Sequence, residues 1–204
     1  MIIGVTGSFG SGKTKVARMF EGLGAHVIDA DKVCHSLMAP PSKVYRSVVK
    51  HFGTSILDKA KRIDRKKLAR AVFKKRSELA LLDRLVHPEA IKEIEKIARA
   101  NKKRKVVVID APLLVESGFY KKLDTLVVVK NNISKQASRV SRAKGLRKNE
   151  IIERIRMQAP FTKKAALADF IIDNSGSAKK TLLQVKEIWK HTGVRYGSKR
   201  KTGY

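Results

Sequence analysis

Residues 2–14 carry the strongest structural signal in the chain. They read Ile2-Ile3-Gly4-Val5-Thr6-Gly7-Ser8-Phe9-Gly10-Ser11-Gly12-Lys13-Thr14. The first five form a short, β-branched apolar run, which is typical of a buried strand in a parallel sheet. The last eight match G-x-x-x-x-G-K-[ST], and apolar residues recur at helical spacing directly after them. A strand, a glycine-rich loop and a helix in this order predict a loop that holds phosphate groups.

Each part of this loop has a physical role in binding a nucleoside triphosphate. Backbone N–H groups curl around the anion, and the helix N-terminus adds partial positive charge. The Lys13 ammonium reaches the β- and γ-phosphates, and the Thr14 hydroxyl is a ligand for Mg²⁺. A simple turn at the end of a strand is the alternative, and a dinucleotide fold is disfavoured because no G-x-G-x-x-G follows the strand. The predicted nucleotide-binding residues here are Gly10, Ser11, Gly12, Lys13, Thr14 and Lys15.

Strand and helix patterns alternate along the rest of the chain. Short apolar runs predict four more strands, at residues 26–29, 105–110, 126–129 and 170–172. Helical spacing fills residues 42–100, with a last helix that starts near His87 and Pro88, and returns at 133–143, 150–159 and 182–189. This alternation predicts an α/β fold in which helices flank a parallel sheet of the P-loop NTPase type.

Length and composition favour a single globular domain in a reducing compartment. The chain has 204 residues, of which 46 are Lys or Arg and 18 are Asp or Glu, so its formal net charge is +28. Such an excess favours anionic partners, including non-specific contact with nucleic acid. One cysteine, Cys34, excludes an internal disulfide, and no signal peptide or membrane-spanning stretch is visible, so we expect a cytoplasmic protein. Residues 193–204 are basic without any acidic residue and are predicted to be a disordered tail.

Three carboxylates follow predicted strands, at the edge of the sheet where ligands of open α/β sheets bind. Asp110 ends the third strand and has the position of a carboxylate that completes a Mg²⁺ shell. Asp31 lies just past the second strand and is expected to accept the proton of an acceptor hydroxyl. Asp29 either serves the site or caps the helix that follows, since Asp is favoured at helix N-caps.

Basic side chains near the predicted fourth and fifth strands suggest a lid. Arg139 and Arg142 are three residues apart on a predicted helix and therefore share a face. Phosphoryl transfer needs cations over the triphosphate, and a mobile helical lid commonly supplies them. The alternative is that both are ordinary surface arginines. Sequence physics alone makes His87 a cap or packing residue at the start of a helix.

These segments resemble the dephospho-CoA kinase family in the same order along the chain. The resemblance runs from residue 3 to about residue 189. Besides the phosphate loop, it rests on Val27-Ile28-Asp29-Ala30-Asp31, Leu85-Val86-His87-Pro88, Asp110-Ala111-Pro112-Leu113-Leu114-Val115-Glu116, Arg139 to Leu146, Arg154-Ile155 with Gln158, and Asp169 to Gly176. The phosphate loop is generic, whereas the Asp-Ala-Asp, His-Pro and Pro-Leu-Leu pieces are specific.

The resemblance implies ATP-dependent phosphorylation of the ribose 3′-hydroxyl of dephospho-coenzyme A, with Mg²⁺. It implies one kinase domain over residues 1–192, with a helical substrate-binding insertion at about 42–100 and a lid at about 133–165. Asp31 is then the general base, and Asn174 lies near the adenine of ATP. Lys13, Arg139 and Arg142 act on the phosphates. The residues expected to line the dephospho-CoA side are His87, Leu113, Leu114 and Glu116.

The sequence also departs from the family pattern. Ser8 and Phe9 stand where the family usually has Gly and Ile, and Arg147 replaces a Ser, so Asn149 is expected to take over that helix cap. Two other functions stay open: another small P-loop kinase for a nucleoside, nucleotide or small alcohol, and a nucleic-acid-binding P-loop protein. The charge favours the latter, but aromatic residues are only 6% of the chain, too few for a base-stacking surface.

Overall fold

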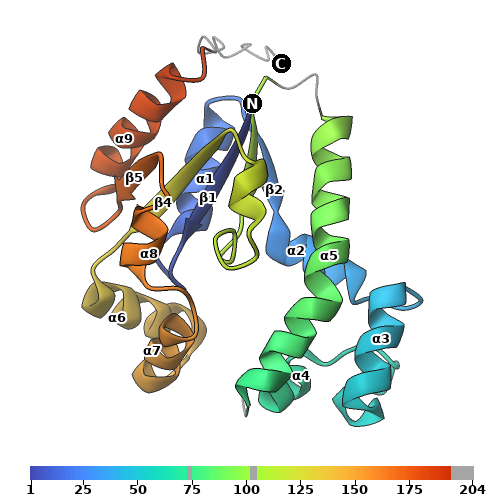
Figure 1. Cartoon of the computed structure of the whole chain (residues 1–204). Helices are drawn as coiled ribbons and strands as arrows, with labels where there is room; N and C mark the ends of the chain where they lie inside the picture. Colours follow the sequence, from blue (N-terminus) through green and yellow to red (C-terminus); the bar gives the residue numbers. More distant parts are fainter. Residues whose placement is uncertain (73–74, 102–104, 194–204) are drawn as a thin grey trace, which may run out of the picture. The chain divides into compact units, whose positions relative to one another are not determined.

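The predicted parallel sheet is present. The computed structural model describes residues 1–72, 75–101 and 105–193 (Figure 1). Its sheet has the strand order β2-β3-β1-β4-β5, and β1 runs parallel to both β3 and β4, as β4 does to β5. The strands are β1 (Ile2–Gly7), β2 (His26–Asp29), β3 (Val107–Asp110), β4 (Thr125–Lys130) and β5 (Phe170–Asp173). This confirms the α/β fold class.

Helices account for most of the remaining described residues. The α-helices are α1 (Lys13–Gly22), α2 (Ala30–Leu37), α3 (Lys43–Phe52), α4 (Arg65–Val72), α5 (Arg76–Ala100), α6 (Ile133–Lys144), α7 (Lys148–Arg156), α8 (Phe161–Ala165) and α9 (Ala178–Lys190). Two short 3₁₀ segments, η1 (Thr54–Ile56) and η2 (Phe119–Lys122), lie between them. Among the described residues, no helix is both long and apolar enough to cross a membrane.

The chain divides into two compact units. The first, called the sheet unit below, comprises residues 1–28 and the chain from Ala100 onward. The second, the helical unit, comprises Asp29–Arg99 and holds α2 to α5. The predicted insertion at 42–100 falls almost wholly within the helical unit, which begins earlier, with α2. The predicted tail, apart from Gly193, lies outside the described residues.

The core of the sheet unit fixes the two elements that flank the phosphate loop. Apolar side chains of α1 and α9 pack with those of the sheet strands, so β1 and α1 are fixed on both flanks of the loop. On β1, a Cβ at Gly4 would lie 2.7 Å from Leu114 Cδ1 and 2.2 Å from Leu123 Cδ1. A larger residue here would have to push these two leucine side chains aside, because the segment after β3 packs closely against the strand that leads into the loop.

The helical unit has its own core, and one predicted boundary in it is wrong. Val48 and Leu68 are among the residues buried there. No helix begins at His87: α5 runs unbroken from Arg76 to Ala100 with Pro88 inside it. Proline removes one helical hydrogen bond, but α5 keeps a buried stripe at four-residue spacing on both sides of it, and burial of that stripe offsets the loss. The buried residues of this stripe are Val86, Ala90, Ile94 and Ala98.

Candidate functional site

The phosphate loop, residues 7–14 and called the P-loop below, joins β1 to α1. Gly10 and Gly12 have backbone φ angles of 78° and 98°, which residues other than glycine rarely adopt. Gly12 is the N-cap of α1 and offers no side-chain acceptor to the N–H groups of the first helical turn. A helix N-terminus of this kind attracts an anion through its N–H groups and its dipole. The geometry therefore suits a phosphate group.

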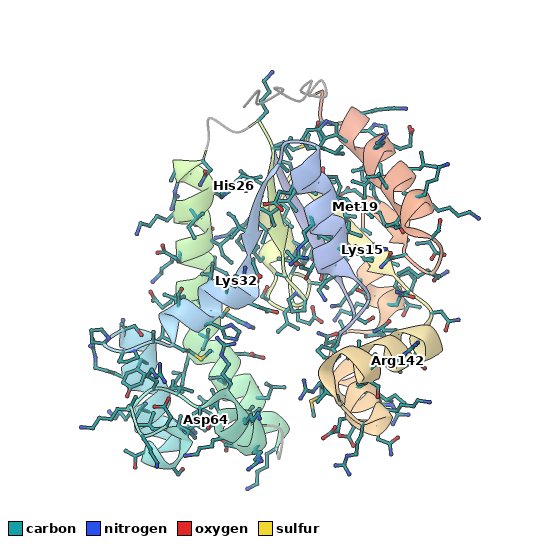
Figure 2. All side chains as sticks on the ribbon, turned by 180° about the vertical axis from the view of Figure 1, so that it is seen from behind. Lys15, Met19, His26, Lys32, Asp64 and Arg142 are labelled. Atoms are coloured by element: carbon teal, nitrogen blue, oxygen red, sulfur yellow. The ribbon has the colours of Figure 1, made fainter. Side chains whose placement is uncertain are left out.

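Three side chains of α1 stand at this helix start. Lys13 is half-exposed, and its Nζ donates to the Ser8 carbonyl oxygen at 3.3 Å. Thr14 and Lys15 are exposed in the same turn, and Figure 2 labels Lys15. Because the Lys13 ammonium already spans the P-loop, a short rotation of its flexible side chain keeps it within reach of a bound phosphate.

Two side-chain amides, one of them buried, bond to the backbone of the P-loop. The Ser11 carbonyl oxygen accepts from Asn131 Nδ2 at 3.2 Å and from Asn174 Nδ2 at 2.8 Å. Asn174 is 4% exposed, and its Oδ1 accepts from the Thr181 hydroxyl at 3.1 Å. Both polar atoms of the Asn174 side chain are thus engaged with protein groups. The structure places this predicted nucleotide residue beneath the P-loop, where it fixes the backbone.

Asp110 lies beside the P-loop at the end of β3. It pairs in register with Val5 of β1, two residues before the loop, and is 6% exposed. The described residues contain no cluster of three His, Cys, Asp or Glu side chains that would bind a metal without a ligand's help. Mg²⁺ in phosphoryl-transfer sites takes only one or two protein carboxylates and fills its shell with phosphate oxygens and water. Asp110 and the Thr14 hydroxyl fit that requirement.

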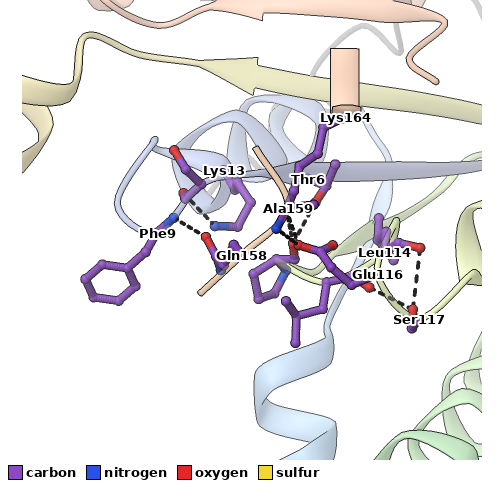
Figure 3. A network of polar contacts seen from close by, with 12 residues as sticks. Thr6, Phe9, Lys13, Leu114, Glu116, Ser117, Gln158, Ala159 and Lys164 are labelled. Atoms are coloured by element: carbon purple, nitrogen blue, oxygen red, sulfur yellow. Dashed lines mark hydrogen bonds and ion pairs between the residues drawn. The ribbon is translucent and has the colours of Figure 1, made fainter. Parts of the chain in front are cut away.

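A buried ion pair, unforeseen from the sequence, organises the segment that follows Asp110. The Lys164 side chain of α8 is 1% exposed, and its Nζ donates to the Pro112 carbonyl oxygen at 2.7 Å and pairs with Glu116 Oε1 at 3.0 Å (Figure 3). Thr6 donates its hydroxyl to the same carbonyl oxygen at 3.0 Å. Burial lowers the pKa of Lys164, and the Glu116 carboxylate opposes that shift. Lys164 stands next to Lys163 in a lysine-rich chain, so no sequence pattern marks it.

The predicted acceptor-side residues of this segment differ in exposure. Leu114 is 2% exposed and packs toward the β1 backbone, as a core residue does. Leu113 is half-exposed, and the side chain of Glu116 is 22% exposed. Glu116 Oε1 also accepts the Ala159 N–H at 2.8 Å. Leu113 is therefore the more accessible of the two leucines.

Helices α6 and α7, called the lid helices below, occupy the predicted lid. The Arg142 side chain is exposed on α6, with its Nε 3.4 Å from the Ser138 carbonyl oxygen (Figure 2). Arg139 belongs to the same helix, but its side chain lies outside the described part of the structure. The expected Asn149 cap is wrong, because α7 begins at Lys148 and its N-cap is Arg147. The backbone N–H of Arg147 donates to Glu150 Oε2 at 2.8 Å.

The helical unit carries the remaining predicted residues. Asp29 is the N-cap of α2 and accepts the Lys32 N–H at 3.0 Å, so its capping role is present. Asp31 lies in the first turn of α2 with its side chain exposed. His87 lies mid-helix in α5 and pairs with Asp83 at 3.4 Å. Of the two aspartates, Asp31 is the one in an exposed position.

A cavity of about 320 Å³ lies within the helical unit. Its wall is largely apolar, with His35, Arg62 and Arg65 as polar members. Burial, and next the charge of Arg65, lower the pKa of His35. The cavity thus combines apolar surface with two cationic side chains. Its apolar members include Met38, Leu68, Val72 and Leu82.

Comparison with known proteins identifies the family. The family model described as dephospho-CoA kinase matches residues 1–180. The chain belongs to the dephospho-CoA kinase family. A dephospho-CoA kinase from Aquifex aeolicus is 43% identical over 187 residues, covering 92% of this chain and 95% of the relative. One from Carboxydothermus hydrogenoformans is 37% identical over 194 residues, covering 93% and 94%. The resemblance deduced from the motifs is confirmed.

Solved structures support the same family and fold. A dephospho-CoA kinase from Campylobacter jejuni superposes with a TM-score of 0.67 at 26% identity and covers 93% of this chain and 96% of its own. A protein from Thermus thermophilus superposes with a TM-score of 0.82 at 27% identity, covering 96% and 98%. A shikimate kinase from Acinetobacter baumannii, at 17% identity and a TM-score of 0.54 with coverage of 93% and 91%, shares the fold.

Proposed function

We propose that this member of the dephospho-CoA kinase family transfers the γ-phosphoryl group of ATP to the ribose 3′-hydroxyl of dephospho-coenzyme A, giving coenzyme A and ADP. The observation that carries the proposal is the P-loop at the uncapped N-terminus of α1, with Lys13 in the loop and Asp110 on the neighbouring strand. This arrangement supplies backbone donors, a cation and a carboxylate, which phosphoryl transfer requires. Family membership supplies the acceptor.

In this proposal the protein positions charge around the transferred group. Lys13 neutralises charge that develops on the β- and γ-phosphates, and Arg139 and Arg142 of α6 approach the triphosphate from the lid. Thr14 and Asp110 would hold Mg²⁺, which, when bound, draws charge from the phosphate oxygens. Asp31 takes the proton of the acceptor hydroxyl, which is otherwise a weak nucleophile. Its exposed position on α2 leaves its carboxylate accessible to a substrate.

The helical unit is proposed to bind the acceptor. Dephospho-coenzyme A joins an adenosine and a diphosphate to an extended, largely uncharged arm. The cavity of the helical unit offers apolar wall for such an arm and the Arg62 and Arg65 side chains for an anionic group. His87 and Leu113 are assigned to the same substrate, and the Glu116 carboxylate is assigned to it through its remaining oxygen.

The test couples ADP release to acceptor specificity. We expect ADP to form on addition of dephospho-coenzyme A, with the product bearing a 3′-phosphate by mass spectrometry and NMR, and little to form with shikimate or nucleosides. Turnover of another alcohol in preference would assign the chain to a different acceptor. The other candidate function is nucleic-acid binding, which the net charge of +28 favours. A gel-shift titration with RNA at increasing salt tests it. Tight RNA binding without kinase turnover would make that candidate the function.

A further inference from the structure

The tip of the P-loop is held by two glutamines from the lid region. Gln158, just after α7, accepts the Phe9 N–H on its Oε1 at 2.7 Å (Figure 3). Gln136 of α6 is fully buried, and its Nε2 donates to the Phe9 carbonyl oxygen and, at 3.2 Å, to Ser8 Oγ. Both backbone polar groups of Phe9 thus bond to side chains of the lid region. A change in the backbone at Phe9 must therefore disturb these bonds.

The side chain of Phe9 strengthens this connection. Phe9 packs on the apolar cluster of the lid helices, which includes the buried Val140 and Ile151. The Arg154 guanidinium lies 5.4 Å from the centre of its ring, within the range of a cation–π contact. At the neighbouring Gly10, an added Cβ would lie 2.4 Å from Val140 Cγ2, so the backbone of the P-loop touches α6 directly. The P-loop tip and the lid helices therefore form one packed cluster.

The base of the lid is anchored next to this contact. Ala159, the residue after Gln158, donates its N–H to Glu116, whose carboxylate is held by the buried Lys164. Lys164 also binds the Pro112 carbonyl oxygen, two residues after Asp110. Consecutive residues thus bond in two directions, Gln158 to the P-loop and Ala159 to the segment that follows Asp110. This arrangement mechanically links the P-loop, the lid helices and that segment.

We propose that Gln158 and Lys164 are positioning residues for phosphoryl transfer, which make the lid helices respond when the P-loop takes up a triphosphate. Lys164 holds the lid base through Glu116 and Ala159, and Gln158 transmits the position of Phe9 to it. The inference rests on the proposed kinase activity. Misplacement of catalytic groups by about 1 Å costs up to roughly 10²-fold in rate, so loss of either link lowers kcat.

Matched variants separate this role from simple packing. Gln158→Leu removes the oxygen that accepts the Phe9 N–H, and Gln158→Glu keeps an acceptor there. Lys164→Met removes a buried charge, and Lys163→Met removes the exposed charge beside it. At a temperature where circular dichroism shows each variant folded, we expect Gln158→Leu and Lys164→Met to lower kcat by roughly ten- to 10²-fold. KM for dephospho-coenzyme A should change little in Gln158→Leu, whereas Lys164→Met should also raise it, because Lys164 holds the Glu116 carboxylate. Lys163→Met should retain the parental kcat, and Gln158→Glu, which keeps the acceptor but adds a charge, should retain more of it than Gln158→Leu.

A second measurement needs no acceptor. Hydrogen–deuterium exchange of α6 and α7 is followed with and without a non-hydrolysable ATP analogue. We expect the analogue to slow exchange in the parent and in Lys163→Met, and to slow it less in Gln158→Leu. Parental kcat and parental protection in Gln158→Leu would overturn the inference, even if Lys164→Met fails to fold. A parent that is inactive on dephospho-coenzyme A refutes the proposed function alone, because the exchange experiment still decides the inference.

Discussion

The sheet unit and the helical unit hold their candidate functional residues in different ways. Around the P-loop, side chains bond to backbone groups of distant segments: Asn174 to Ser11, Gln158 to Phe9, Lys164 to Pro112. In the helical unit the candidates bond within one turn of their own helix, as Asp29 does to Lys32 and His87 does to Asp83. The P-loop is therefore held by long-range contacts, whereas the candidate residues of the helical unit lie on helices and bond locally. Substitutions in the two units should accordingly fail in different ways.

The largest loss of turnover separates catalysis from folding in the sheet unit. Lys13→Ala removes the P-loop cation, and loss of one such transition-state donor lowers kcat by about 10²-fold or more. Lys13 is half-exposed, so the variant should fold, with parental circular dichroism. The exposed Lys179→Ala serves as the control and should keep full turnover. If folded Lys13→Ala keeps the parental kcat, the proposed role of the P-loop in phosphoryl transfer is wrong.

Two neighbouring leucines of the predicted acceptor segment should affect turnover less than Lys13 does, one through stability and the other through substrate binding. Leu114 is 2% exposed, so Leu114→Ala should lower the free energy of unfolding by about 2–5 kcal/mol. The 54% exposed Leu183→Ala is the matched control and should cost little. Leu113→Ala should instead raise KM for dephospho-coenzyme A. Denaturant titration and steady-state kinetics measure both, and an unaltered stability of Leu114→Ala contradicts its place in the core.

Cys34 is expected to affect turnover least. The reactivity of its thiol reports on the charges around it in the helical unit. Burial, followed by the charges of Asp31 and Asp83, raises the pKa of the Cys34 thiol to about 11. Because the thiolate is the reactive form, reaction with a thiol reagent at pH 8 should be roughly 10²-fold slower in the folded protein than in denaturant. Asp31→Asn removes a negative charge and should speed the reaction of the folded protein. Equal rates in folded and denatured protein would contradict a raised pKa.

The contrast between the units also decides what sequence could predict. The P-loop, its flanking elements and Asp110 were predictable because glycine positions, strand runs and strand ends are local features. The boundary at His87 was wrong, because the buried stripe of α5 outweighs Pro88. No local pattern marks Lys164 or Gln136, because their roles depend on contacts with Pro112 and Phe9, which lie far away in the sequence. Local patterns therefore gave the P-loop itself, and long-range packing supplies its support.

Asp31 remains the residue on which the proposed mechanism depends, and its neighbour Asp29 provides the internal control. Asp29 caps α2 through the Lys32 N–H, whereas Asp31 is exposed in the first turn of the same helix. An asparagine keeps the shape of either residue and removes its basicity.

The decisive measurement is kcat with dephospho-coenzyme A for Asp31→Asn and Asp29→Asn, with ATP binding followed by calorimetry. A positioned base contributes roughly 10²- to 10⁴-fold, so Asp31→Asn should lose turnover in that range while it still binds ATP. Asp29→Asn should lose less, because an asparagine still caps a helix. The opposite order, with Asp29→Asn the more damaging, would contradict the assignment of Asp31 as the general base.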